Sequence, residues 1–127
     1  FVILLALLAF LVSCSTSMQS IRPISMRPIN ELVVFGDSLS DTGNVYRTTG
    51  GLYPPHPPYF QGRYSNGRVW VEYLASELKL NATQIINFAY GGATTGTNQV
   101  LGVPGLTAQV QSFSQSQNQA NPDALYT

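Results

Sequence analysis

Short apolar runs rich in β-branched residues alternate along this chain with segments of helical periodicity, and this alternation constrains the fold more than any other feature. The run at 31–35 (ELVVF), bounded by Asn30 and Gly36, predicts a buried strand. Residues 84–89 (QIINFA) and 123–127 (DALYT) predict two more strands. Strands separated by helices run parallel and are joined by right-handed crossovers, so we expect an α/β protein.

Two amphipathic helices are predicted between these strands. The first covers about 68–79 and is capped by Ser65 or Asn66, and the second covers about 105–117. Core-facing residues are expected at helical spacing: Trp70, Tyr73, Leu74 and Leu78 (with Val69 alongside) in the first helix, and Leu106, Val110 and Phe113 in the second. Residues 48–67 contain the two proline pairs of Pro-Pro-His-Pro-Pro and predict a long surface loop, because proline breaks helices and central strands.

The apolar run Phe1–Val12 predicts an export signal. Its twelve residues fit the hydrophobic core of a signal peptide and fall short of the roughly 20 needed to span a bilayer. The run ends Leu-Val-Ser-Cys14, which resembles the lipobox of bacterial lipoproteins. Two interpretations stay open: residues 1–14 are a lipoprotein signal with Cys14 acylated, or a secretory signal is cut around 13–17.

In either case we expect an exported protein that is periplasmic, extracellular or anchored to a membrane through lipidated Cys14. Residues 15–30, which carry two prolines and several serines, predict a flexible tether. The chain begins with Phe1 and lacks a basic segment ahead of the apolar run, so we expect the sequence to be incomplete at its start.

Composition argues against several classes of function. Charged residues make up only 9% of the chain, with six basic and six acidic side chains and a net charge of zero. The basic residues are scattered, whereas nucleic-acid binding needs clustered Lys and Arg, so no nucleic-acid partner is expected. A single cysteine excludes an intrachain disulfide, and one Cys with one His argues against a metal site of those residues. No metal or organic cofactor is expected.

The segment 36–44 (GDSLSDTGN) follows the first predicted strand directly. Ligands of open parallel sheets bind beyond the carboxyl ends of the strands, which is where Ser38 would lie. Gly36 permits a sharp turn, and free backbone N–H groups near a serine hydroxyl can hold a developing oxyanion. The simpler alternative is a plain turn in which Ser38 or Asp37 caps a helix.

Three segments together resemble the GDSL (SGNH-hydrolase) family of esterases and lipases. They are GDSLSDTGN at 36–44, RYSNGRVW at 63–70 and NFAYGGA at 87–93, in the order expected for that family. The resemblance covers about residues 32–127 and implies a three-layer α/β/α, flavodoxin-like fold. Residues 31–127 would then be the N-terminal part of an SGNH/GDSL hydrolase domain, with a parallel sheet that is incomplete in this chain.

The resemblance further implies a serine esterase or lipase that hydrolyses carboxylic esters. Ser38 would be the nucleophile, and the backbone N–H groups of Ser38 and Gly91 would stabilise the oxyanion, with Gly92 the near alternative to Gly91. Asp37 resembles the acid of the family motif and is expected to be structural, with its carboxylate accepting backbone N–H groups. Two further motif residues are expected to cap or brace the turn and not to touch substrate: Asp41 and Asn44.

The family's catalytic Asp and His and its third-block Asn are not found in the sequence. His56, the sole histidine, lies among four prolines and is not expected to be the base. We therefore expect truncation at both ends, an active parent esterase and an inactive fragment. Expected substrates are lipids, short acyl esters or acetylated sugars. Two interpretations stay open for four aromatic loop residues: they line an acyl or sugar site, or they merely cover the core. These residues are Tyr53, Tyr59, Phe60 and Tyr64. The alternatives are a non-catalytic surface lipoprotein that binds a ligand with the same fold, and transfer of the acyl group to an alcohol.

Overall fold

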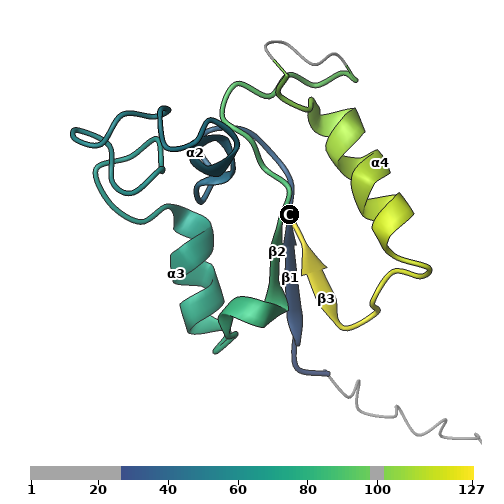
Figure 1. The fold of residues 1–127 in the computed structure, drawn as a ribbon. Helices are drawn as coiled ribbons and strands as arrows, with labels where there is room; N and C mark the ends of the chain where they lie inside the picture. Colours follow the sequence, from purple (N-terminus) through teal and green to yellow (C-terminus); the bar gives the residue numbers. More distant parts are fainter. Residues whose placement is uncertain (1–26, 98–101) are drawn as a thin grey trace, which may run out of the picture.

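Three short parallel strands form the centre of the protein, and their order is β2-β1-β3 (Figure 1). The computed structural model describes residues 27–97 and 102–127. The strands are β1 (Glu31–Val34), β2 (Ile85–Asn87) and β3 (Ala124–Tyr126). All three predicted strands and their parallel direction are confirmed. The predicted signal, Cys14 and the tether up to residue 26 lie outside the described residues.

Strand β1 is the middle strand and is buried on both faces. Leu32, Val33 and Val34 are all 0% exposed. Leu32 and Val34 pack into a cluster with residues of α3, while Phe35 on the other face stacks on Phe88 and meets the edge of Phe113. Burial on both faces explains the unbroken apolar character of this segment, which is typical of parallel sheets covered by helices on both sides.

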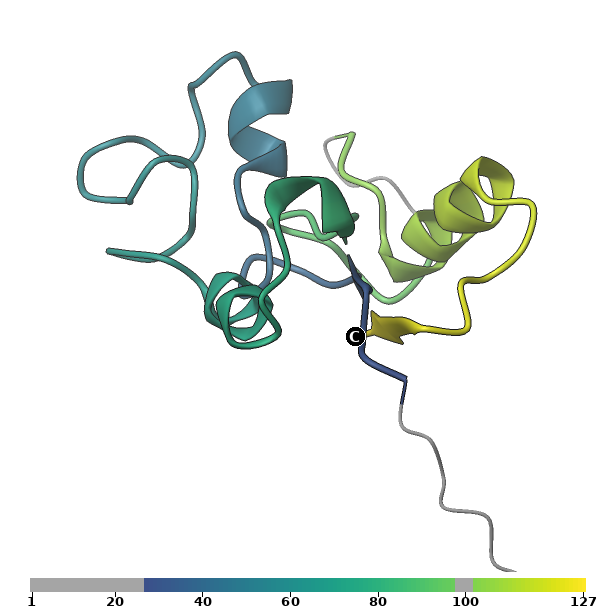
Figure 2. The same cartoon turned by 90° about the horizontal axis from the view of Figure 1, so that it is seen from below.

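Four helical segments accompany the sheet in the part of the chain that the structure describes. They are α2 (Asn44–Thr48), α3 (Trp70–Glu77), the 3₁₀ turn η1 (Ala82–Gln84) and α4 (Leu106–Ser116). Helices α3 and α4 lie on opposite sides of the sheet, which gives the expected α/β/α layering (Figures 1 and 2). The two predicted helices are present, whereas α2 was not predicted. No helix among the described residues combines the length and apolar character that crossing a membrane requires.

The predicted inward face of α3 is partly wrong. Val71 and Ala75 are buried and Leu74 packs beside them, whereas Trp70 and Tyr73 are 46% and 59% exposed. Small and β-branched residues at this face let the helix lie close to the sheet, while the larger aromatic rings project from its sides.

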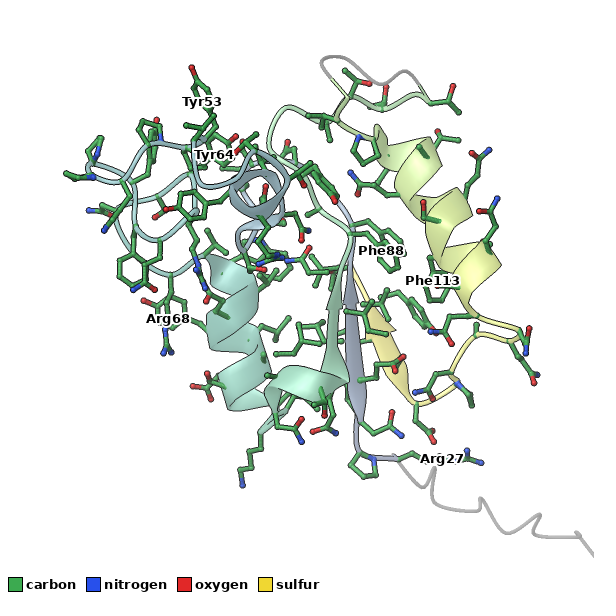
Figure 3. All side chains as sticks on the ribbon, in the orientation of Figure 1. Arg27, Tyr53, Tyr64, Arg68, Phe88 and Phe113 are labelled. Carbon is green, nitrogen blue, oxygen red and sulfur yellow. The ribbon has the colours of Figure 1, made fainter. Side chains whose placement is uncertain are left out.

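The predicted inward face of α4 also needs correction. Leu106 and Val110 are 39% and 44% exposed, and the residue buried most deeply is Gln109, at 1% exposure. Only Phe113 of the predicted apolar stripe packs inward, where its ring meets Phe35, Phe88 and Tyr126 edge to face (Figure 3). An amide therefore replaces an apolar side chain at the point where α4 meets the end of β1.

The start of α3 is capped by a carboxylate and not by Ser65 or Asn66 as predicted. Glu72 Oε2 accepts the N–H of Val69, the N-cap residue, at 2.9 Å. Its other oxygen accepts Arg63 Nη2 at 2.6 Å in a partly buried ion pair. The helix start is thus joined to the preceding loop through one side chain.

The pKa of Glu72 reflects these contacts. Burial acts to raise the pKa of the carboxyl, but the hydrogen bonds from Arg63 and Val69 and the nearby positive charges outweigh burial and lower it. A lowered folded-state pKa stabilises the protein above the unfolded-state pKa of Glu, about 4.3. This contribution is lost as the pH falls through the folded-state pKa.

We predict that Glu72→Gln lowers the free energy of unfolding by roughly 1–2 kcal/mol at pH 7, because it removes a charge-assisted cap and ion pair. The difference from wild type should shrink as the pH falls below about 4. Denaturant unfolding at a series of pH values measures it. The matched control is Glu77→Gln, at an exposed carboxylate of the same helix, with an expected change within about 0.5 kcal/mol. A Glu72 difference that stays constant down to pH 3 would contradict the prediction.

Candidate active site

Ser38 lies in a tight turn immediately beyond the carboxyl end of β1. The carbonyl of Asp37 accepts the N–H groups of Ser40 and Asp41 at 3.1 and 3.0 Å, and Asp37 Oδ1 accepts the N–H of Leu39 at 3.0 Å. Gly36 enters the turn with φ +142°, a conformation that favours glycine. Ser38 is half-buried, and within 27–97 and 102–127 its backbone N–H has no acceptor. The Asp37 carboxylate thus accepts a backbone N–H within the turn, and its purely structural role stays a prediction.

A second loop follows β2 and runs alongside the first. Phe88 N–H donates to the Val34 carbonyl at 2.7 Å, and Tyr90 N–H donates to the Gly36 carbonyl at 3.1 Å. These bonds extend the β1–β2 pairing beyond both strands. The glycines that follow Tyr90 are consequently held beside the serine turn, as the carboxyl ends of neighbouring parallel strands require.

The carboxylate of Asp41 links the two loops. Its Oδ1 accepts the N–H groups of Gly43 and Asn44 at 2.7 and 2.5 Å, and its Oδ2 accepts those of Val45 and Gly91 at 3.2 and 2.9 Å. Asp41 is 0% exposed. Four N–H donors thus satisfy both oxygens of this buried carboxylate and replace the water that it loses on burial.

Two asparagine side chains add further links between the loops. Asn44 Nδ2 donates to the carbonyls of Asn87 and Ala89 at 3.0 and 2.7 Å. Asn87 Nδ2 donates to the carbonyl of Ser40 at 2.8 Å. Among the described residues no buried side-chain nitrogen or oxygen lacks a partner. Asp41, Asn44 and Asn87 thus connect the two loops by hydrogen bonds, and the expectation that Asp41 and Asn44 do not touch substrate stays a prediction.

The two consecutive glycines of the second loop differ in what their N–H groups do. The Gly91 N–H already donates to Asp41, so it is not open to a substrate, and the expectation that it completes the oxyanion hole does not fit this geometry. Gly92 is exposed, has φ +87°, and within the part of the chain that the structure describes its N–H has no acceptor. Of these two glycines, the one whose N–H has no acceptor among the described residues is therefore Gly92, which the sequence analysis gave as the alternative to Gly91.

Position 91 requires glycine for a steric reason, which is the close approach of the Tyr64 ring. A Cβ at position 91 would lie 2.1 Å from Tyr64 Cε2, so only glycine lets this ring pack against the loop. Burial raises the pKa of the Tyr64 phenol, and the negative charge of Asp41 followed by that of Tyr59 raises it further. The phenol is neutral at physiological pH and introduces no second charge beside Asp41.

Two hollows flank this pair of loops. The tyrosine hollow has a volume of ≈ 470 Å³ and is lined by Val45, Thr49, Tyr53, Tyr64, Gly91, Gly92 and Val103. The tryptophan hollow has a volume of ≈ 400 Å³ and is lined by Gly36, Asp37, Leu39, Ser40, Trp70, Ala93, Thr94, Thr95 and Leu106. Ser38 lines neither, although its turn contributes to the second. Of the four aromatic loop residues singled out in the sequence, Tyr53 and Tyr64 line a hollow, and Tyr59 and Phe60 do not.

The sequence-predicted residues are not all brought together. His56 is exposed, and its Nδ1 contacts the Tyr59 carbonyl oxygen within its own loop; no hydrogen bond joins it to Ser38. No group of three or more metal-ligating side chains occurs within the described residues. Gln109 was missed by the sequence analysis. The sequence did contain a signal for it: an amide side chain on the face of the predicted helix 105–117 that was expected to point inward.

Comparison with known proteins identifies what the loops belong to. Residues 32–127 match the family described as GDSL-like Lipase/Acylhydrolase. One relative, the phosphatidylcholine-sterol acyltransferase of Aeromonas hydrophila, is 46% identical over 94 residues, which are 74% of this chain and 25% of that protein.

Two further relatives are named for other activities or roles. The secreted effector protein SseJ of Salmonella typhimurium is 43% identical over 77 residues, 60% of this chain and 19% of that protein. An acetylesterase of Thermothelomyces thermophilus is 38% identical over 86 residues, 62% of this chain and 28% of that protein. The chain thus spans between 19% and 28% of the length of these three relatives.

We predict that Asp41→Asn lowers the free energy of unfolding by about 2–4 kcal/mol. The amide keeps the size of the carboxylate but turns a donor toward N–H groups that need an acceptor. Denaturant unfolding measures the change. Asp123→Asn is the control, because that carboxylate forms a solvent-exposed ion pair with Arg27 at 3.4 Å, and its loss should cost less than about 1 kcal/mol. Equal changes for the two variants would show that Asp41 does not hold the loops together.

Proposed function

Since the chain belongs to the GDSL-like lipase/acylhydrolase family, we propose that it carries the nucleophile and two oxyanion donors of a serine ester hydrolase. One observation carries this proposal. Within residues 27–97 and 102–127, the N–H groups of Ser38 and Gly92 have no acceptor, and they lie on two loops that hydrogen bonds hold together. The residues that follow them, Leu39 and Ala93, have bonded N–H groups. Open donors beside a serine hydroxyl suit the charge that develops on an ester carbonyl.

In the proposed reaction, Ser38 Oγ forms a bond to the ester carbonyl carbon while its proton passes to a general base. The carbonyl oxygen becomes the oxyanion, which the N–H groups of Ser38 and Gly92 receive. The intermediate then breaks its bond to the alcohol oxygen, which leaves with a proton, and water releases the acid from the acylated serine. Each oxyanion donor typically contributes about 10²–10³ in rate.

The proton acceptor is proposed to be a histidine other than His56. A base must lie within hydrogen-bond reach of the serine hydroxyl, and His56 instead contacts its own loop. The relatives are several times longer than this chain, so their length leaves room for such a histidine outside these 127 residues.

The tyrosine hollow is proposed to receive the acyl chain of the ester. Gly92 lies in its lining, so a carbonyl oxygen on the Gly92 N–H would place its substituent in or beside the hollow. Val45, Val103 and the ring faces of Tyr53 and Tyr64 offer a mainly apolar surface. Its volume of ≈ 470 Å³ lies within the range of small-molecule sites and exceeds what an acetyl group needs. We therefore propose a hydrocarbon acyl ester in preference to an acetylated sugar.

Two further points of function are proposals as well. Acyl transfer to an alcohol is the second candidate reaction, because one relative is named an acyltransferase.

Export is proposed from the apolar run Phe1–Val12 and from the name of the relative called a secreted effector, with Cys14 as a lipid-anchoring residue. A ligand-binding lipoprotein without activity would keep the fold and show no reaction at Ser38.

We predict that a fluorophosphonate probe labels the intact gene product, expressed from its natural start to its natural stop codon, and that Ser38→Ala abolishes both labelling and ester hydrolysis. Mass spectrometry locates the adduct. The control is Ser40→Ala in the same turn, which should keep the adduct at Ser38. Labelling that persists in Ser38→Ala would overturn the nucleophile assignment, and an unlabelled wild-type protein would favour the binding alternative.

We predict that Val103→Trp, which fills the tyrosine hollow, reduces kcat/KM at least 10-fold for octanoyl esters and by less than 3-fold for acetyl esters. Loss of apolar contact for a chain of several CH₂ groups costs more than the ~1.4 kcal/mol that corresponds to 10-fold. Val110→Trp, at a half-exposed position of α4, is the control and should change neither. An equal loss for both esters would argue against an acyl chain in this hollow.

A further inference from the structure

The side chain of Gln109 is bound to the peptide groups of Gly36, two residues before Ser38. Its Oε1 accepts the Gly36 N–H at 2.9 Å, and its Nε2 donates to the Gly36 carbonyl at 2.9 Å. Nε2 also donates to the Pro104 carbonyl at 3.0 Å. The amide thus uses its oxygen once and both of its N–H groups, and it is 1% exposed.

These bonds lie just beyond the carboxyl end of β1. Phe35, the first residue after β1, donates its N–H to the Thr127 carbonyl at 2.9 Å. The next N–H, that of Gly36, points toward α4 and is received by Gln109. The Gly36 carbonyl accepts two hydrogen bonds, one from Tyr90 N–H and one from Gln109 Nε2. The Gln109 amide therefore binds both backbone polar groups of Gly36.

Gly36 needs such support because nothing intrinsic fixes its backbone. Glycine explores far more of conformational space than other residues, and φ +142° is one of several conformations open to it. Any rotation at Gly36 would change the direction of the turn that follows, including the N–H and hydroxyl of Ser38. Two hydrogen bonds to one rigid amide on a helix remove that freedom.

We infer that Gln109 is a positioning residue, which fixes the Gly36 peptides and thereby orients the Ser38 hydroxyl and N–H toward the ester. This inference rests on the proposed function, because it assigns Gln109 a role in the reaction at Ser38. A side chain needed only for stability would have the same contacts. The two roles differ in what happens in the folded variant: loss of positioning lowers the rate of bond formation, whereas loss of stability alone does not.

The test is Gln109→Met in the intact gene product, since methionine matches the length of glutamine and lacks its hydrogen bonds. We expect kcat and the rate of fluorophosphonate labelling to fall together by about 10- to 100-fold, with KM changed less than 3-fold, because small misplacement of a reacting group has effects of this size. Amide exchange of Gly36 should become faster. Gln111→Met, at an exposed position of the same helix, should leave all of these unchanged.

The outcomes separate the two proposals. If wild type neither hydrolyses esters nor is labelled at Ser38, the proposed function fails. If wild type reacts and folded Gln109→Met is labelled at the wild-type rate, only the positioning role fails. Should Gln109→Met not fold, Gln109→Glu replaces it, because a carboxylate still accepts the Gly36 N–H but cannot donate to the Gly36 carbonyl. Failure of both variants to fold would overturn the inference, since the amide would then serve folding and not orientation.

Discussion

The buried carboxylate of Asp41 is the interaction on which the arrangement of the two loops depends. A negative charge without water is tolerated only when donors surround it, and here four backbone N–H groups do so. Three of these donors belong to the segment that starts α2, and the fourth is Gly91 from the loop after β2. The same contact that stabilises the charge therefore fixes the distance between the serine turn and the second glycine loop.

The three motif segments, which are far apart in the sequence, contact one another here. The first supplies Asp41, the third supplies the Gly91 N–H that Asp41 accepts, and the second supplies Tyr64, whose ring packs against Gly91. Glycine at position 91 is needed for this close packing, whereas glycine at position 92 leaves an open N–H on an exposed loop with φ +87°. Glycine is thus favoured at these two adjacent positions for different physical reasons.

The sequence predicted the strands and the serine turn well, because buried parallel strands are continuous apolar runs and Gly36 marks a sharp bend. It predicted helix faces less well. Counting Trp70 and Tyr73 as core residues assumed that large rings point inward, but close helix–sheet packing selected Val71 and Ala75 instead. The role of Gln109 and the choice between Gly91 and Gly92 depend on which hydrogen bonds form across 50 or more residues, and local periodicity carries no such information.

Under the proposed function, both oxyanion donors in this chain are backbone N–H groups, which every amino acid except proline provides. Side chains can then vary around the loops without removing these donors, provided that Asp41 and the asparagines keep the loops in register. Substrate choice must come from the linings of the flanking hollows, such as Tyr53, Tyr64 and Val103. Such a separation agrees with the general observation that one fold carries sites for different substrates, and the proteins similar to this chain include one named for phosphatidylcholine and one named an acetylesterase.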